Sequence, residues 1–183
     1  MKHFSIVSIT VAMFFCLSVS AQAQDAAQDD AMKNCPMHKQ HAMDDHHATV
    51  EKHGDQGRGF SHDATTHHFR IASNGGVIEV TANDPTDKTS TEAIRSHLSH
   101  IAVMFKNGDF STPMFVHDGL PPGVTTMKLL KSNIGYNYEE IASGGRVHIK
   151  SDDPVAVAAI HDFLRFQISE HQTGDSLEIE STH

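Results

Sequence analysis

The chain has 183 residues, a formal net charge of −9 with histidine neutral, 16 histidines and two cysteines. The acidic excess argues against nucleic acid and anionic membrane surfaces as partners, and it suits a protein that attracts cations. Apolar periodicity is confined to a stretch of roughly 110 residues, which is enough for one small domain.

Residues 1–23 have the pattern of a secretory signal. Lys2 is followed by an apolar stretch and then by the small-x-small sequence Ala21-Gln22-Ala23. We expect cleavage after Ala23 or Ala21 and a periplasmic or secreted mature protein that does not insert into the membrane. Cleavage removes Cys16 and leaves Cys35 alone, as a metal ligand, a reactive thiol or half of an intermolecular disulfide.

Residues 24–62 are rich in Ala, Asp, Gln, His and Met and contain little that can build a core. We interpret them as a disordered metal-binding tail, the alternative being a passive polar linker. Thiolate and thioether groups suit Cu(I), whereas imidazole also binds Cu(II), Zn(II) and Ni(II). The candidate ligands are Cys35, Met37, His38, His41, Met43, His46 and His47.

The segment Cys35-Pro36-Met37-His38 resembles the CPMH segment of heavy-metal-binding stretches in bacterial copper and silver efflux proteins. The resemblance implies that the tail binds soft cations and that a metal-efflux or metal-receiving protein is a partner. Lys39 follows where those stretches usually have proline, so the local turn is expected to differ.

Residues 63–175 contain an internal repeat. The first copy reads GGVIEVTANDP and then TEAIRSHLSHIAVMFKNGD, and the second reads GGRVHIKSDDP and then VAAIHDFLRFQISEHQTGD. Paired glycines favour a tight hairpin turn in each copy, and Asp-Pro and glycine are typical of a helix start and a helix end. The chain should then close with a tail at residues 176–183.

These patterns predict an α+β fold, in which duplicated ββα units form a four-stranded antiparallel sheet with two main helices on one face. A short extra helix is expected near residues 125–131. The stripe predicted to be buried in the first helix comprises Ile94, His97, Leu98, Ile101 and Phe105. In the second helix it comprises Ile160, Phe163, Leu164, Gln167 and Ile168.

A second metal site is predicted in the domain. His97, His100 and Met104 recur at helical spacing and share a flank. His67 and His68 are further candidate ligands, of which His67 should point from its strand toward the helices and His68 away from them. We hypothesise that His97 and His100 bind one ion with His67 or His117 as third ligand. Core histidines held by hydrogen bonds are the structural alternative.

Sequence motifs for catalysis give little support to an enzyme, because GxSxG, HExxH, P-loop and CxxCH patterns are absent. We favour a periplasmic metal-binding protein for buffering, resistance or delivery, with copper first and zinc or nickel next. The alternatives are a mononuclear metalloenzyme at His67, His97, His100 and His117, a haem-binding protein with His or Met axial ligands, and a non-catalytic interaction module with pH-sensitive histidines. The oligomeric state is left open.

The domain also resembles a group of small exported bacterial proteins without a settled function, through TTHHF, IRSHLSHIAVMF, STPMFVHD and IHDFLRFQISEH. Some of those proteins carry a carbamoyltransferase label. We do not extend it to this chain, which lacks the Ser-Thr-Arg-Thr phosphate-binding motif of that enzyme. The resemblance implies one exported domain with a face that bears histidines.

Overall fold

The computed structural model describes residues 44–46, 48–54 and 60–180. The chain divides into two units, Met1–Asp44 and Asp45–His183. The elements of the second unit are η1 (His62–Ala64), β1 (Thr65–Ala72), β2 (Gly75–Ala82), α3 (Lys88–Lys106), α4 (Ser111–Val116), α5 (Val124–Leu129), η2 (Lys131–Asn133), β3 (Gly135–Ile141), β4 (Gly144–Lys150) and α6 (Pro154–Glu170). The predicted signal and most of the predicted tail lie outside the described residues.

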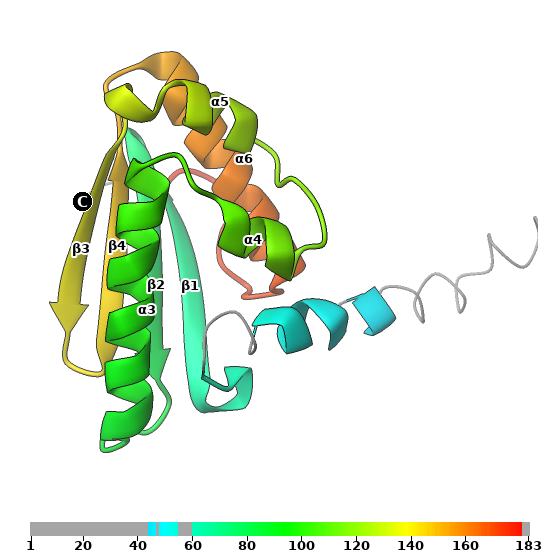
Figure 1. The fold of residues 1–183 in the computed structure, drawn as a ribbon, viewed down its shortest axis with the longest axis vertical. Coiled ribbons are helices and arrows are strands. Elements are labelled where there is room, and N and C mark those ends of the chain that lie inside the picture. Colours follow the sequence, from blue (N-terminus) through cyan, green and yellow to red (C-terminus); the bar gives the residue numbers. More distant parts are fainter. Residues whose placement is uncertain (1–43, 47, 55–59, 181–183) are drawn as a thin grey trace, which may run out of the picture. The chain divides into compact units, whose positions relative to one another are not determined.

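The predicted fold class is confirmed. Four antiparallel strands form one sheet in the order β1-β2-β4-β3, and α3 to α6 follow the two hairpins (Figure 1). Residues 44–46 and 48–54 are also helical. None of the helices that the structure describes is long and apolar enough to cross a membrane.

The strand register shows that the two copies are related by a pseudo-two-fold axis. Across the central β2–β4 pair, Gly76 faces Ile149 and Val80 faces Gly145. Replacing each residue by its repeat equivalent converts one of these pairs into the other. Ile78 faces its own equivalent, Val147, so the axis passes through this pair. The two hairpins therefore join at their inner strands into one sheet.

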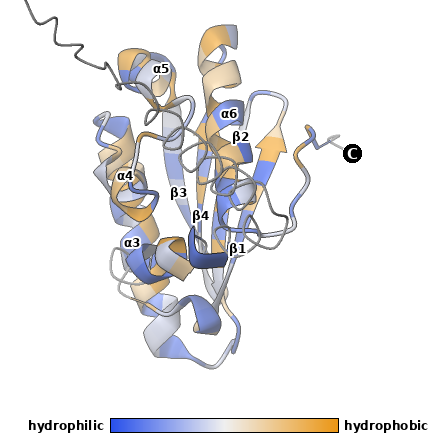
Figure 2. Ribbon diagram, turned by 90° about the vertical axis from the view of Figure 1, so that its right-hand side faces the viewer, coloured by the Kyte–Doolittle hydropathy of each residue, from blue (hydrophilic) through white to orange (hydrophobic). Residues whose placement is uncertain are grey.

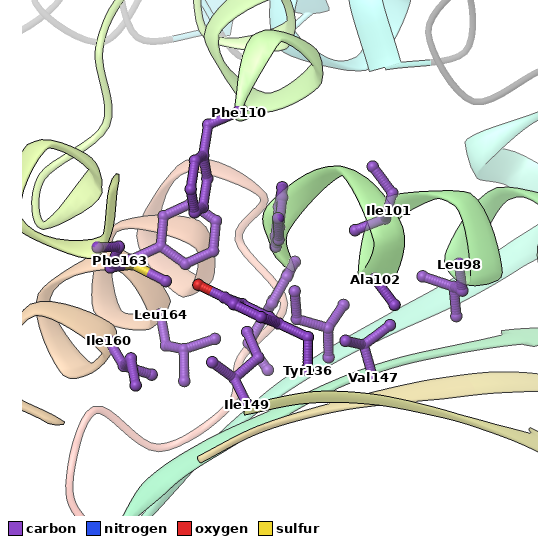
Figure 3. Packing of buried hydrophobic residues seen from close by; sticks show 14 of the residues in the cluster. Leu98, Ile101, Ala102, Phe110, Tyr136, Val147, Ile149, Ile160, Phe163 and Leu164 are labelled. Carbon is purple, nitrogen blue, oxygen red and sulfur yellow. The ribbon is translucent and has the colours of Figure 1, made fainter. Parts of the chain in front are cut away.

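Each main helix lies over the hairpin of the other copy. Helix α3 packs mainly on β3 and β4, whereas α6 packs on β1 and β2. The core fills the space between the helices and the sheet, where Leu98 and Ala102 of α3 lie on the side of the helix that faces Val147 of β4 (Figure 3). Hydrophilic and hydrophobic residues alternate along α3, as expected of a helix with one buried stripe (Figure 2).

Both predicted stripes are buried, with the exception of His97, which is half-buried. The predicted helix ends hold in part. Asp153 caps α6 and Pro154 begins it, but α3 is capped by Asp87, because three extra residues follow Asp84-Pro85 in the first copy. Gly108 adopts a left-handed conformation (φ 78°) just after α3, whereas Gln172 (φ 48°) takes that position after α6.

The paired glycines are required by close approach of the central strands. A Cβ atom on Gly75 would lie 2.0 Å from the carbonyl oxygen of Ile149, and one on Gly144 would lie 2.0 Å from that of Val80. The second glycine of each pair lies under a leucine of the opposite helix, since a Cβ on Gly76 would meet the side chain of Leu164 at 2.3 Å. Any side chain at these positions would push the central strands or the helices apart.

Segments on both sides of the predicted domain also belong to it. Val50 and Phe60 lie within the predicted tail of residues 24–62, yet they are buried at 1% and 8% exposure, and Phe60 belongs to the core cluster. At the other end, the backbone N–H of Glu180, in the predicted tail of residues 176–183, donates to the carbonyl oxygen of Ile71 in the edge strand β1 at 2.8 Å. Part of each predicted tail therefore contacts the domain.

We predict that Gly144→Ala destabilises the domain by about 3 kcal/mol, because the added Cβ meets backbone rather than a movable side chain. Gly119→Ala is the matched control: its Cβ would meet only the carbonyl oxygen of His117, at 3.7 Å, and its effect should stay within about 0.5 kcal/mol. Urea unfolding of both variants measures the difference. Equal stabilities would contradict the close approach of β2 and β4.

A second prediction concerns Asp175, whose carboxylate accepts hydrogen bonds from Phe69 N (2.9 Å), Thr173 Oγ1 (2.7 Å) and His68 Nδ1 (2.8 Å). Burial alone would raise the pKa of Asp175, but these hydrogen bonds outweigh it and lower the pKa below the ordinary 3.8. The folded state therefore keeps the charge at a pH where the unfolded chain binds a proton, and this stabilisation is lost as pH falls below 3.8.

Asp175→Asn should accordingly lower stability by about 1–2 kcal/mol at pH 7, and the gap to the wild type should narrow as pH falls below 3.8. Chemical unfolding at a series of pH values tests this. The exposed Asp152, changed to Asn, serves as control. If the difference in stability between the wild type and Asp175→Asn does not depend on pH, the charge of Asp175 does not stabilise the contact with β1.

Candidate functional site: a histidine pocket

A cavity of about 70 Å³ lies between the sheet and helices α3, α4 and α6. We call it the histidine pocket, because His67, His97, His117 and His171 line it. They come from β1, α3, the end of α4 and the end of α6. The other lining residues are Phe69, Ile78, Val80, Leu98, Ile101, Phe105, Thr112, Pro113, Val116, Phe163 and Gln167.

His117 is the most deeply buried of the four histidines. Its Nε2 lies 3.1 Å from Oε1 of Gln167. Because a carbonyl oxygen only accepts, Nε2 carries the proton and Nδ1 keeps its lone pair. Nδ1 has no hydrogen-bond partner among the described residues. Burial lowers the pKa of His117 from its ordinary 6.5, against opposing effects of Gln167 and Glu170, so the ring favours the neutral form. A buried neutral imidazole with a free lone pair can bind a metal or accept a proton.

His171 connects the other rings of the pocket. It stacks on His67 with ring centroids 6.2 Å apart and on Phe69 at 5.7 Å, and it meets the edge of His117 at 5.0 Å. Phe60 extends the row, since it stacks on His67 at 6.2 Å and meets the edge of His97 at 5.7 Å. The imidazoles are thus fixed in orientation by aromatic neighbours.

The repeat provides an internal comparison for this pocket. The positions equivalent to His67, Gln167 and His171 in the other copy are Tyr136, Ile101 and Phe105. There the rings pack closely: Phe105 stacks on Phe110 at 4.3 Å and meets Tyr136 at 5.9 Å. The same framework therefore accepts a filled aromatic core, and the polar residues of the histidine pocket are not needed for packing.

Three of the four histidines of the predicted domain site, His67, His97 and His117, line the pocket, and the strand alternation that turned His67 toward the helices is confirmed. The fourth, His100, is exposed and lies outside it. At 100° per residue, the four pocket-lining residues of α3 cluster within about 100°, and His100 lies on the far side of His97 from them. The helix turns that flank toward solvent.

The remaining predicted groups have other roles. Met104 packs against the core, and its sulfur accepts a hydrogen bond from the Thr112 hydroxyl at 3.8 Å. His68 is held by Asp175. Gln167 orients His117, and the neighbouring Asp118 is exposed. His171 and Gln167 are the pocket residues that the sequence analysis left out of the site, although a glutamine in an apolar stripe was a signal.

A carboxylate stands beside His117. Oε2 of Glu170 lies 3.8 Å from Nδ1 of His117, and it accepts a hydrogen bond from Nε2 of His46 at 2.6 Å. We call His46, His117 and Glu170 the Glu170 corner. Within the part of the chain that the structure describes, no three His, Cys, Asp or Glu side chains are already placed to hold one metal ion.

The other predicted tail ligands, which are Cys35, Met37, His38, His41, Met43 and His47, lie outside the described residues. Comparisons of the chain with protein-family models, with curated proteins and with solved structures find no match.

We predict that NMR of the imidazole nitrogens shows His117 as the Nε2–H tautomer at neutral pH. His161, whose Nε2 donates to the carbonyl oxygen of Ala72 at 2.9 Å, is an internal reference for that tautomer. Gln167→Met should lower stability by about 1–3 kcal/mol, because it leaves the buried N–H without an acceptor. An Nδ1–H tautomer for His117 in the wild type would contradict the assigned hydrogen bond.

Proposed function

We propose that this chain is an exported metal-binding protein, with copper as its first ion and zinc or nickel next, that serves metal buffering, resistance or delivery. The soft donors of the tail, Cys35, Met37 and His38, would capture the ion, with Met43 as a fourth ligand. A metal-efflux or metal-receiving protein would be the partner.

The observation that carries the proposal is the Glu170 corner. His46 belongs to the predicted metal-binding tail of residues 24–62. It contacts Glu170, whose carboxylate stands 3.8 Å from Nδ1 of His117, the nitrogen that keeps its lone pair. Two ligand atoms of a tetrahedral zinc or copper ion lie roughly 3.4 Å apart, since each bond is about 2.1 Å long. His117 and Glu170 are therefore close to a two-ligand spacing.

A third ligand requires only movement of an exposed side chain. The side chain of His46 is 55% exposed, so it can turn from its hydrogen bond with Glu170 to a shared ion. Gln167 supplies what metal-bound histidines usually have, a hydrogen-bond acceptor for the ring nitrogen that does not bind the metal. Haem receives less support, because a cavity of about 70 Å³ is small beside the roughly 150 Å³ that holds benzene.

The first test uses the chain expected after signal cleavage, Gln24–His183. Saturating Zn(II) or Cu(II) should raise the unfolding temperature of the domain, because the ion binds the folded corner more tightly than the unfolded chain. His117→Phe or Glu170→Gln should abolish this rise, whereas His100→Gln, an exposed histidine on α3, should retain it. A rise that survives in both corner variants would rule out the Glu170 corner as a metal site.

A companion titration tests the tail. Cys35→Ser combined with Met37→Ala should weaken Cu(I) binding at least tenfold in competition with a chelator, since it removes the soft donors. The domain variants should leave this Cu(I) affinity unchanged. If the double variant binds Cu(I) like the wild type, the tail is not the soft site.

A further inference from the structure

The interior of the histidine pocket is chemically distinct from the Glu170 corner. Ile78, Val80, Leu98, Ile101 and Phe163 contribute apolar walls, and Lys, Arg, Asp and Glu are absent from its described lining. A charged group that entered this space would lose its hydration, and it would gain no counter-ion while the lining imidazoles are neutral. The lining therefore selects against ions and favours a neutral, largely apolar occupant.

Among the described residues of the pocket, two buried side-chain nitrogens lack a hydrogen-bond partner: Nδ1 of His117, which is an acceptor beside Glu170, and Nε2 of Gln167, which is a donor. Gln167 is 4% exposed, and its Oε1 is used by His117, but its Nε2 has no hydrogen-bond partner among the described residues. An amide nitrogen is a donor only, so the occupant must offer an acceptor. The equivalent position in the other copy is Ile101, which needs no such partner.

The cavity volume limits the size of the occupant. A dry cavity of roughly 150 Å³ holds benzene, which has six carbon atoms. A cavity of about 70 Å³ therefore holds about three or four non-hydrogen atoms. One carbonyl group with two short alkyl substituents matches both the volume and the single unpaired donor.

We propose that the histidine pocket binds a small neutral carbonyl compound, whose oxygen accepts a hydrogen bond from Nε2 of Gln167 and whose alkyl groups contact Val80, Leu98 and Phe163. The carbonyl end of a larger molecule fits equally if the rest of that molecule extends out of the pocket. This proposal stands independently of metal binding, because it uses the interior of the pocket and not Glu170.

The experiment uses Gln24–His183 in the presence of EDTA, with methyl groups labelled for NMR. Acetone and acetate are compared as probes, since both are planar with four non-hydrogen atoms and differ in charge. Xenon reports whether the apolar space is open without testing the hydrogen bond. Acetone should shift the methyl signals of Val80, Leu98 and Ile101 in a saturable way in the millimolar range, and acetate should not; the exposed Val155 should stay unchanged with both.

Gln167→Glu keeps an oxygen for His117 but removes the amide donor. It should weaken acetone binding about fivefold or more, the factor expected for one neutral hydrogen bond, while xenon still binds. Retained xenon binding shows that the variant is folded with its cavity open. His100→Gln should bind acetone like the wild type.

Three outcomes would overturn the proposal. Acetate that binds as tightly as acetone would show an anion site. Acetone binding that is unchanged in Gln167→Glu would remove the role of the amide. An absence of saturable shifts with both xenon and acetone would mean that ordered water or side chains fill the cavity. EDTA removes metal ions from every sample. The acetone, acetate and xenon results can therefore be interpreted whether or not the chain binds metal.

Discussion

The pairing of β2 with β4 across the pseudo-two-fold axis is the constraint on which the rest of this structure depends. Gly75 and Gly144 approach the backbone of the opposite central strand so closely that no side chain fits, and Gly76 makes room for Leu164 of the helix above it. Only with these contacts do two hairpins form one sheet, so that each main helix covers the hairpin of the other copy. Neither half can bury its own helix alone, and the duplicated unit therefore folds as one core.

Departure from the symmetry of the repeat creates the histidine pocket. One copy has Ile101 and Phe105, whose ring stacks on Phe110, at the positions where the other copy has Gln167 and His171. Buried polar groups weaken a core unless hydrogen bonds satisfy them. Here Nε2 of His117 bonds to Gln167, whereas Nδ1 of His117 and Nε2 of Gln167 have no hydrogen-bond partner among the described residues. Polar residues that packing does not require, in a framework that also accepts an apolar core, are the main structural indication of a binding function. The hydroxyl of Tyr136 is also buried without a hydrogen-bond partner among the described residues.

His117 joins the two chemistries proposed for this pocket. Its Nδ1 faces the carboxylate of Glu170, which is not part of the pocket lining, and its Nε2 is held by Gln167, which is. An ion bound at the Glu170 corner and a neutral molecule inside the pocket would therefore act on opposite nitrogens of one ring. The contact of His46 with Glu170 brings one histidine of the predicted tail to the same place, through an exposed side chain that can move.

Local patterns in the sequence determined the two hairpin-helix units, the α+β class, the buried stripes of α3 and α6 and the inward direction of His67, because turns, caps and side-chain periodicity depend on neighbours along the chain. Tertiary structure alone decided which helix covers which hairpin, that Asp87 and not Asp84 caps α3, and that residues near Val50 and Glu180 join the domain. It also decided that His171 and Gln167 enter the pocket while His100 faces solvent. These outcomes depend on the rotation of each helix about its axis and on contacts such as His117–Gln167 between residues far apart in the chain, which no local pattern encodes.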